Sequence, residues 1–500
     1  MIALWMTLLP WIGALCLLLF KGWMDRFSRF LPGLVAAANV LLALLLNLQG
    51  SQQPTLVSLE MGNWPAPFGI QWVNDSLSSF FALVISLVLL ALVLSRGFAR
   101  DKEQQASSDV YSSAIVLILS GAAFGLLFTA DLFNLFVLME IASISLYALV
   151  ARSRHPTAPV ASMRYLLLGG VGSALYLLGI GVLYAKLGTL NMADIALKAS
   201  SLNPAALQLV PLLLLLGLAV ELEMFPFNAW VPQVYGAGGA FVPGFLAGVS
   251  SPIFALLLLR LVTVVFPVPQ LRTVLLVAGL LTLVIGEFSA LASRRLLKML
   301  AFSSVGSMGM FLLLVSIPGA AMLRSSLFWL VMMLLAKVPL LGVAAYLQRQ
   351  FGTDRFLELR GIFSQEKSAG LVFLLSAASI TGIPLFAGFR AKIQALVSLA
   401  SAQYWLLILP LLVSVLEFVY FFRAIRWMGM EPPESAGGKP VLPGSLEGFS
   451  RTGTLFLFSV FALLIVIFGL FPQGILDSIE VATTQLFDPV VYARAVLGGM

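Results

Sequence analysis

Apolar runs of about 20 residues recur along the whole chain, separated by short polar stretches. A helix needs about 20 apolar residues to cross a bilayer. Membrane β-strands alternate polar and apolar positions over about ten residues, whereas these runs are apolar on every face. The pattern therefore predicts an all-α integral membrane protein with about 14 transmembrane helices. The expected spans are 2–20, 28–47, 74–95, 109–128, 130–151, 164–186, 206–236, 240–266, 273–293, 297–317, 320–345, 368–397, 403–426 and 453–474.

Two of these spans are interrupted in the middle. Span 206–236 contains Pro226, and span 368–397 contains Gly382 and Pro384. A break frees backbone groups that lipid cannot satisfy, so it persists only against protein or a wet cavity. Paired breaks in corresponding positions of two halves point to a transport pathway at a repeat interface. The two prolines lie 158 residues apart, which predicts two five-helix repeats, the second inverted relative to the first.

The predicted organisation has four parts. They are 1–108 with helices one to three, 109–266 as the first repeat, 267–426 as the second repeat, and 427–500 as a polar linker, a last helix and a tail. The linker is expected over 427–452, on the cytoplasmic side. The tail, Pro472 to Met500, is expected to form an amphipathic helix at the membrane interface.

The composition narrows the chemistry. Hydrophobic residues make up 60% of the chain and charged residues 10%, whereas a soluble domain has roughly 25% charged residues. There is one cysteine, Cys16, and one histidine, His155. Iron–sulfur clusters need four thiolates and haem needs axial ligands, so we expect no metal, cofactor or catalytic chemistry in this chain itself.

The basic residues predict an orientation. Twenty of the 29 lysines and arginines lie in alternate loops, and only five lie in the intervening ones. Because cytoplasmic loops are enriched in Lys and Arg, both termini are expected on the non-cytoplasmic side of a cell (inner) membrane. The net charge of +7 is scattered over short loops, so it reports orientation in the lipid bilayer rather than nucleic-acid binding.

Several ionisable residues fall inside the expected spans, where each charge costs about 2.5–3.5 kcal/mol at a helix centre. They are Asp131, Glu140, Glu221, Glu223, Arg260, Glu287, Lys337, Arg390, Lys392 and Glu417. An ionisable residue within a membrane is by default a functional-site hypothesis. Glu140, Glu221, Lys337 and Lys392 are the leading candidates for ion translocation.

The acids near the first break allow alternatives. Glu140 could instead be a structural acid bonded to Ser143 or Ser145, and Asp131 is expected to be a helix cap or an entry-loop acid. Glu221 and Glu223 are two residues apart, so they point to nearly opposite sides of a regular helix, and only one is expected to face the pathway.

The remaining charges also allow more than one interpretation. Glu223 could pair with Arg260 or bond the loosened backbone. Lys337 and Lys392 can release and regain protons if they are buried. Glu417 could be an exit-side acid or a partner of Lys392. Glu287, closer to a helix end, is expected to be structural.

Four stretches together resemble the antiporter-like subunits shared by Mrp-type cation/proton antiporters, respiratory complex I and energy-converting membrane hydrogenases. They are Asp131–Glu140 (DLFNLFVLME), Phe225–Tyr235 (FPFNAWVPQVY), Leu300–Gly309 (LAFSSVGSMG) and Gly382–Lys392 (GIPLFAGFRAK). The Asp-Leu-Phe-Asn form of the first stretch most resembles the D-type subunit of the Mrp antiporter and its hydrogenase relatives.

The resemblance implies a function and a set of residues. It implies proton, or coupled Na⁺/H⁺, translocation by one subunit of a multisubunit membrane complex. It also implies that Glu140 is the acid of helix five, Lys337 the central lysine of helix eleven and Lys392 the terminal lysine of broken helix twelve.

This chain departs from the family pattern at three places. The helix-seven lysine position, five before the proline, is Glu221. The helix-eight lysine or histidine is replaced near Ser251, and the histidine before the helix-eleven lysine is absent. Two facing carboxylates cannot both ionise cheaply, so we expect Glu140 and Glu221 to share a proton and hand it toward Lys337 and Lys392.

Three settings remain open: an antiporter driven by an ion gradient, a pump of a redox-driven complex of the complex I or hydrogenase type, and a scaffold whose first half-channel does not work. A stand-alone solute carrier is less favoured, because no polar constellation for a substrate stands out beyond the acids and lysines. Carboxylates serve both Na⁺ and H⁺, so the ion stays open as well.

Overall fold

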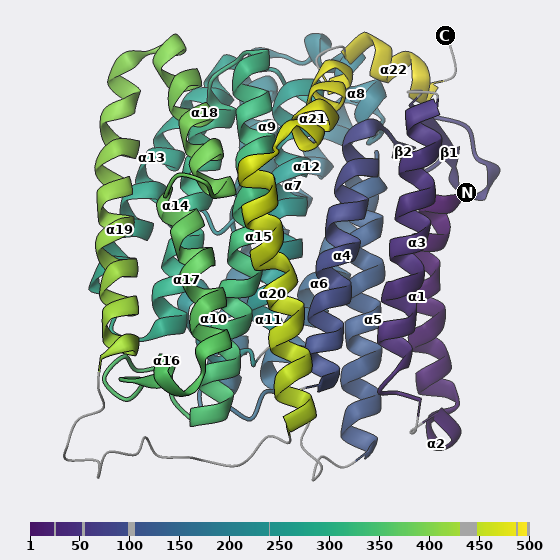
Figure 1. The fold of residues 1–500 in the computed structure, drawn as a ribbon. Helices are drawn as coiled ribbons and strands as arrows, with labels where there is room; N and C mark the ends of the chain where they lie inside the picture. The colour runs from purple at the N-terminus through teal and green to yellow at the C-terminus, as the bar shows by residue number, and fades with distance from the viewer. Residues whose placement is uncertain are drawn as a thin grey trace.

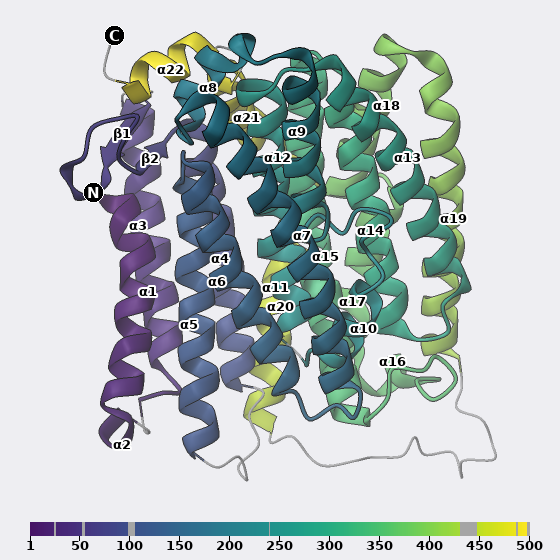
Figure 2. The same ribbon diagram turned by 180° about the vertical axis from the view of Figure 1, so that it is seen from behind.

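The computed structural model describes residues 1–24, 27–52, 56–98, 106–239, 241–430, 448–486 and 489–497. Long helices lie side by side in a bundle (Figures 1 and 2). The first half contains α1 (Ile2–Leu19), α2 (Lys21–Met24), α3 (Leu31–Gln52), α4 (Ser76–Phe98), α5 (Ala106–Phe128), α6 (Leu132–Ala151), α7 (Ala158–Leu187), α8 (Met192–Lys198), α9 (Pro204–Ala219), α10 (Val231–Ala237), α11 (Val242–Phe245) and α12 (Ser251–Arg260). Two π-helical segments, η3 (Leu246–Ser250) and η4 (Leu261–Val265), flank α12.

The second half continues the bundle. It contains α13 (Pro269–Ala292), α14 (Leu296–Ser316), α15 (Ala320–Phe351), α16 (Ile362–Gln365), α17 (Lys367–Thr381), α18 (Ala387–Ala402), α19 (Ile408–Gly429), α20 (Gly448–Leu470), α21 (Gln473–Leu486) and α22 (Pro489–Leu497). Three short 3₁₀ turns connect elements: η1 (Met61–Asn63), η2 (Ala199–Ser201) and η5 (Tyr404–Leu407). A small antiparallel hairpin of β1 (Val57–Glu60) and β2 (Gln71–Asn74), which the apolar pattern did not predict, sits at one end.

The predicted all-α membrane class is confirmed. Among the described residues, 11 helices are long and apolar enough to cross a membrane, or up to 12 if the bent pair of α20 and α21 is one span. The halves of the two broken spans, such as α9 and α17, are shorter apolar helices. The count of fourteen and the four-part organisation therefore stay predictions, and most of the predicted linker 427–452 lies outside the described residues.

The start of α1 and the C-terminal helix α22 lie at the same end of the bundle, with the hairpin and α8 (Figure 1). The short helices α2 and α16 lie at the opposite end, which we call the basic end because Lys21, Arg295 and Arg360 belong to its loops and short helices. A bend of 79° separates α20 from α21, and α21 lies across the end of the bundle that holds α22. There Glu480 of α21 pairs with Arg324 of α15 at 2.6 Å.

The first break ends α9 in a tight turn. The amide of Met224 donates to the carbonyl of Ala219 at 3.0 Å, and the amide of Glu223 donates to Val220 at 3.2 Å. Together these two bonds form a Schellman motif, in which one residue takes the left-handed conformation. That residue is Glu223, with φ of 54°. The chain resumes as a helix only at α10.

The second break ends α17 in the same way. The amide of Ile383 donates to Ala378 at 2.9 Å, and that of Gly382 donates to Ser379 at 3.1 Å. Gly382 takes the left-handed position with φ of 81°, which glycine adopts without a Cβ penalty. The broken helices run in opposite directions, since α9 and α18 lie toward one end and α10 and α17 toward the other (Figures 1 and 2).

Helices α13 and α14 approach each other through small residues. A side chain at Gly279 or Gly309 would collide with the backbone of the facing helix. Such small-residue interfaces let membrane helices pack backbone to backbone. Ser307 of α14 and Leu283 of α13 line the same small cavity.

Candidate functional site

Glu140 lies half-buried on α6, and Ser173 of α7 donates a hydrogen bond to its carboxylate. The alternative partners expected from the sequence are not used. Ser143 bonds Glu221 instead, and Ser145 bonds the carbonyl of Ile141. Glu140 is thus held between two helices of the first half.

Glu221 is buried within the turn that ends α9 and faces α6 and α7. One carboxyl oxygen accepts from the Ser143 hydroxyl at 3.0 Å, and the other accepts from the Tyr165 hydroxyl at 2.9 Å. The Tyr165 ring stacks on Trp230 with centroids 3.8 Å apart, which fixes the hydroxyl. Within the described residues no hydrogen bond joins Glu221 to Glu140 directly. Ser143, the partner of Glu221, lies one helical turn from Glu140 along α6.

Glu223 faces the other way, toward the second half. It is completely buried and accepts from the Tyr235 hydroxyl at 2.7 Å and from the Ser251 hydroxyl at 3.1 Å. Ser251 starts α12 directly after the π-helical segment η3, so this distortion presents the hydroxyl to the carboxylate. Each of the two glutamates thus has its own polar partners on its own side, and the expectation that only one of them faces the pathway stays a prediction.

Lys337 lies in the middle of α15. Its ammonium group donates to the carbonyl and hydroxyl oxygens of Ser304 on α14, both at 3.3 Å. The Tyr235 hydroxyl lies 3.4 Å from that same Ser304 hydroxyl. Glu223 also attracts the Lys337 charge. A hydroxyl both donates and accepts, so Tyr235 and Ser304 connect Glu223 to Lys337 by a continuous hydrogen-bonded path.

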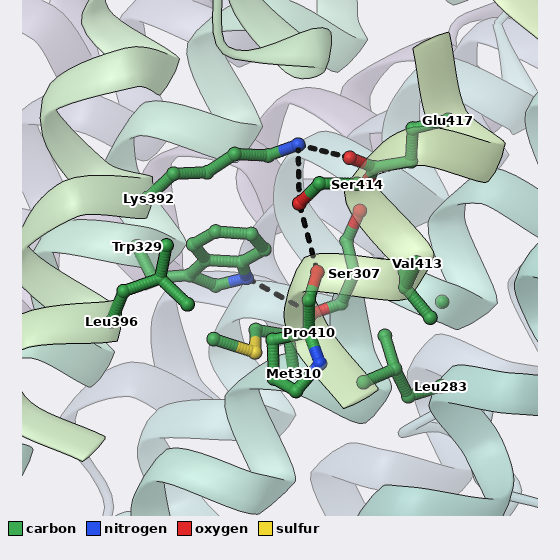
Figure 3. Close-up of a pocket in the computed structure, with 11 residues that line it drawn as sticks. Leu283, Ser307, Met310, Trp329, Lys392, Leu396, Pro410, Val413, Ser414 and Glu417 are labelled. Carbon is green, nitrogen blue, oxygen red and sulfur yellow. Dashed lines mark hydrogen bonds and ion pairs between the residues drawn. The ribbon is translucent and has the colours of Figure 1, made fainter. Parts of the chain in front are cut away.

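Lys392 and Glu417 form a buried ion pair between α18 and α19. Figure 3 shows the Lys392 ammonium pointing at Glu417 and at Ser414, whose hydroxyl lies at 3.4 Å. It also donates to the carbonyl of Thr381, next to the second break, at 3.4 Å. Of the two interpretations of Glu417, the structure supports the partner of Lys392.

Two small cavities accompany the two lysines. One of about 20 Å³ is lined by Lys392, Ser414 and Glu417 (Figure 3), and another of about 20 Å³ by Lys337 and Ser304. Each has room for about one water molecule. Ser307 and Trp329 line both cavities, and the Trp329 indole N–H donates to the Ser307 carbonyl at 3.0 Å. This pair is therefore the wall between them.

A wider pocket of about 430 Å³ lies between α7, α10 and α14. Its charged and titratable lining residues are His155, Arg164, Arg295, Lys298 and Asp354. Gln233 and Gly236 of α10 also line it, on either side of the glutamate partner Tyr235 in sequence. One short helix thus contributes to both the basic pocket and the buried polar path.

Two predicted accessory residues lie elsewhere. Asp131 caps α6 by accepting from the amides of Phe133 and Asn134 at 2.9 and 2.8 Å, which confirms its expected cap role. Arg260 does not pair with Glu223. It bonds both carboxyl oxygens of Asp75 at 2.9 and 2.8 Å, near Tyr492 of α22.

The comparisons with known proteins show the family of the chain. Residues 129–417 match the family model described as NADH:quinone oxidoreductase/Mrp antiporter, transmembrane. The chain is 31% identical to NADH-quinone oxidoreductase subunit N of Desulforudis audaxviator over 84% of this chain and 85% of that one. The chain belongs to this antiporter family.

Two further family relatives are informative. A putative antiporter subunit, mnhD2, of Staphylococcus aureus is 28% identical over 84% of each chain. A chain in the structure of the membrane-bound sulfane sulfur reductase, an archaeal respiratory membrane complex, is 27% identical and superposes with a TM-score of 0.89 over 99% of both chains. The antiporter fold therefore extends over nearly the whole chain.

Within this antiporter family member, the matched residues 129–417 contain all the predicted translocation residues. Sequence reasoning did not single out the hydroxyl groups of Tyr165, Tyr235, Ser251 and Ser304, which bond the buried charges. These residue types are common in helices, and only their position beside a buried charge distinguishes them.

Proposed function

We propose that the chain translocates protons, or protons coupled to Na⁺, across a membrane as one antiporter-like subunit of a multisubunit complex. The observation that carries this proposal is a row of acids and lysines inside the bundle, each bonded to a hydroxyl group or to a charged partner. It starts at Glu140 and Glu221, passes Glu223 and Lys337, and ends at the Lys392–Glu417 pair. Retaining this many charges within a bilayer needs a function.

At one position of this row the charge is opposite to that of the family pattern. At the helix-seven position a lysine is replaced by Glu221, whose partners are the neutral Ser143 and Tyr165. A proton shared among Glu140, Glu221 and these hydroxyls then takes the role of the missing cation. Glu221 and Glu223 receive it on one side of the break and deliver it on the other.

The basic pocket supports an access route and an orientation. It opens at the basic end, and α10 reaches from it to the Glu223 site. We place this end in the cytoplasm and both termini on the opposite side of the cell (inner) membrane, following the distribution of lysine and arginine.

Two five-helix repeats, 109–266 and 267–426, provide the frame for this pathway. The matching turns at Glu223 and Gly382 and the opposite directions of the broken helices support the inverted repeat. Each repeat then supplies one break and one set of proton-binding residues.

The setting has two candidates. The Asp-Leu-Phe-Asn motif favours an Mrp-type antiporter, in which this chain takes the place of the D-type subunit. A redox-driven complex is the second candidate, because relatives include a quinone oxidoreductase subunit and a chain of a respiratory sulfur-reductase complex. Purification of the native complex distinguishes them, since iron–sulfur subunits co-purify only in the second case.

Inverted membrane vesicles that carry the native complex test the function. We expect Lys337→Met to reduce proton uptake at least tenfold, while the exposed Lys186→Met, the same chemical change at the end of α7, leaves it unchanged. Glu140→Gln is expected to reduce uptake as well. Wild-type uptake in both Lys337→Met and Glu140→Gln vesicles would show that the chain is a scaffold.

A further inference from the structure

Glu287 of α13 is a completely buried acid for which the family resemblance and the sequence predict no role in transport. Neither carboxyl oxygen has a partner within hydrogen-bonding geometry among the described residues. A buried carboxyl without a partner is costly, so its presence needs a reason.

The packing of α13 against α14 creates the place for this carboxyl. Gly306 of α14 faces it, and a Cβ at that position would collide with the Oε1 atom of Glu287. Gly286, the preceding residue, lies against the backbone of the same glycine. The two glycines therefore let the carboxyl lie directly on α14, between Ser303 and Ser307 along that helix.

Three charged side chains act on this carboxyl from three other helices. Glu417 of α19 repels it, and Lys392 of α18 and Lys337 of α15 attract it. The Tyr420 hydroxyl of α19 also interacts with it and donates to Ser303 at 3.0 Å. Arg423 of α19 is directed elsewhere, to the carbonyls of Leu291 and Ser293.

A count of the buried charges indicates the protonation state of Glu287. Two buried lysines and three buried acids act on one another across the two halves, namely Lys337, Lys392, Glu223, Glu287 and Glu417. Glu417 neutralises Lys392 directly, and Glu223 is the first partner of Lys337 through the shared hydroxyls. Glu287 is the acid left without a cation of its own, and a lone buried carboxyl avoids the cost of ionisation by keeping its proton.

We propose that Glu287 holds an exchangeable proton between Lys337 and the Lys392–Glu417 pair, and so is a further translocation residue. This inference rests on the proposed function. In the transfer, Lys337 first passes its proton to Glu223 through the Ser304 and Tyr235 hydroxyls. The Glu287 carboxyl then gives its proton to the neutral Lys337 amine, which leaves a carboxylate and restores the ammonium ion. The carboxylate then regains a proton from the side of Lys392 and Glu417, so the charges balance after each cycle.

Glu287→Gln in the native complex tests this role, because glutamine keeps the shape of a protonated carboxyl but cannot release a proton. We expect proton uptake by inverted vesicles to fall at least tenfold, and Glu287→Asp to restore part of it. Gly306→Ala keeps every titratable group but displaces the carboxyl, so it is expected to reduce uptake too. The exposed acid Glu358 provides the matched control, since Glu358→Gln is expected to transport like wild type.

Infrared difference spectroscopy detects the proton on Glu287 itself, so its signal distinguishes proton binding from a purely structural role. The C=O stretching band of a protonated carboxyl is expected in the wild type and Glu287→Asp complexes and absent in Glu287→Gln. Unchanged uptake in Glu287→Gln, or the same carboxyl band in Glu287→Gln as in wild type, overturns the inference. If wild-type vesicles take up no protons, the proposed function fails, and the infrared comparison still decides whether Glu287 holds the proton.

Discussion

Glu223 and Gly382 occupy the same position of the same helix-ending turn, one at each break of the bundle. Both take the left-handed conformation, with φ of 54° and 81°. The conformation costs a non-glycine residue about 1 kcal/mol, and glycine avoids this cost. The first break keeps a strained glutamate where the second has a glycine, so the carboxylate, not the turn, explains the residue at position 223.

Substitutions of Glu223 distinguish the effect of its backbone conformation on stability from the effect of its carboxylate on proton uptake. Glu223→Gly relieves the strained conformation by about 1 kcal/mol and removes the acceptor of Tyr235 and Ser251. We expect the complex to assemble with near-normal thermal stability while proton uptake by vesicles falls at least tenfold. Glu223→Ala loses the same carboxylate without the relief, so it is expected to transport as poorly and to unfold at a lower temperature.

The opposite substitution at the second break provides the control. Gly382→Ala introduces a Cβ in the left-handed position and is expected to lower the unfolding temperature. Normal proton uptake by Glu223→Gly would show that the carboxylate has no part in the pathway.

The buried pair of Lys392 and Glu417 predicts a non-additive stability effect. Removing one partner leaves a buried charge uncompensated, which costs about 3–5 kcal/mol, whereas replacing both with apolar side chains is often nearly neutral. Lys392→Met and Glu417→Leu are each expected to lower the thermal unfolding temperature of the detergent-solubilised complex. The double variant is expected to recover most of the loss while remaining inactive.

A double variant whose loss equals the sum of the two single losses would contradict this coupling. The exposed pair of Arg355 and Glu358 serves as the comparison. Exposed pairs are worth about 0–1 kcal/mol, so its single and double variants are expected to differ little from wild type.

The spans and the two breaks could be predicted from the sequence because they depend on local properties. Apolar length decides the spans, and Pro226, Gly382 and Pro384 disfavour a regular helix. Glu140, Lys337 and Lys392 could be selected for a similar reason, since a charge within an apolar run is visible without a partner.

The partners of these charges could not be predicted, because they depend on contacts between distant helices. Arg260 is 185 residues from its partner Asp75 in the sequence, and several helices lie between the two along the chain. The left-handed conformation of Glu223 was not predictable either, since that position normally favours glycine. The buried environment of Glu287 could not be predicted from the sequence, because it is produced by glycines on two different helices.

Trp329 is expected to control passage between the two lysine cavities. Its ring and Ser307 form the shared wall, and its indole N–H holds the Ser307 carbonyl. Trp329→Ala removes the wall and lets water join the cavities, so we expect passive proton leak through vesicles that hold an imposed pH gradient to rise several-fold. Trp329→Phe, which removes the N–H but keeps an aromatic ring, is expected to give an intermediate leak.

The half-exposed Trp405 offers the matched control for this change. Trp405→Ala is expected to leave the leak unchanged. A truncation of Trp329 costs about 3–5 kcal/mol of core packing, so assembly of each variant is checked by size-exclusion chromatography before the leak is measured. If vesicles that carry Trp329→Ala show no increase in proton leak and normal proton uptake, the wall has no role in passage.

His155, in the basic pocket, predicts a pH dependence that can be followed at a single residue. Partial burial disfavours the charged imidazolium and the nearby Arg295 guanidinium repels it, so the pKa of His155 lies below its ordinary value of 6.5, with Asp354 partly opposing the shift. Because the folded state disfavours the protonated form, its small contribution to stability is present above about pH 6.5 and is lost as the pH falls through the folded pKa.

The titration of His155 can be measured directly, because it is the only histidine in the sequence. In ¹³C-histidine-labelled, solubilised protein, we expect an NMR midpoint below 6.5 that rises in Arg295→Gln and falls further in Asp354→Asn. These two residues form an ion pair at 2.7 Å, and each substitution also exposes His155 to the charge of the remaining partner, which strengthens the two opposite shifts. Shifts of the same sign in the two variants would show that loss of the local fold, rather than charge, controls the midpoint.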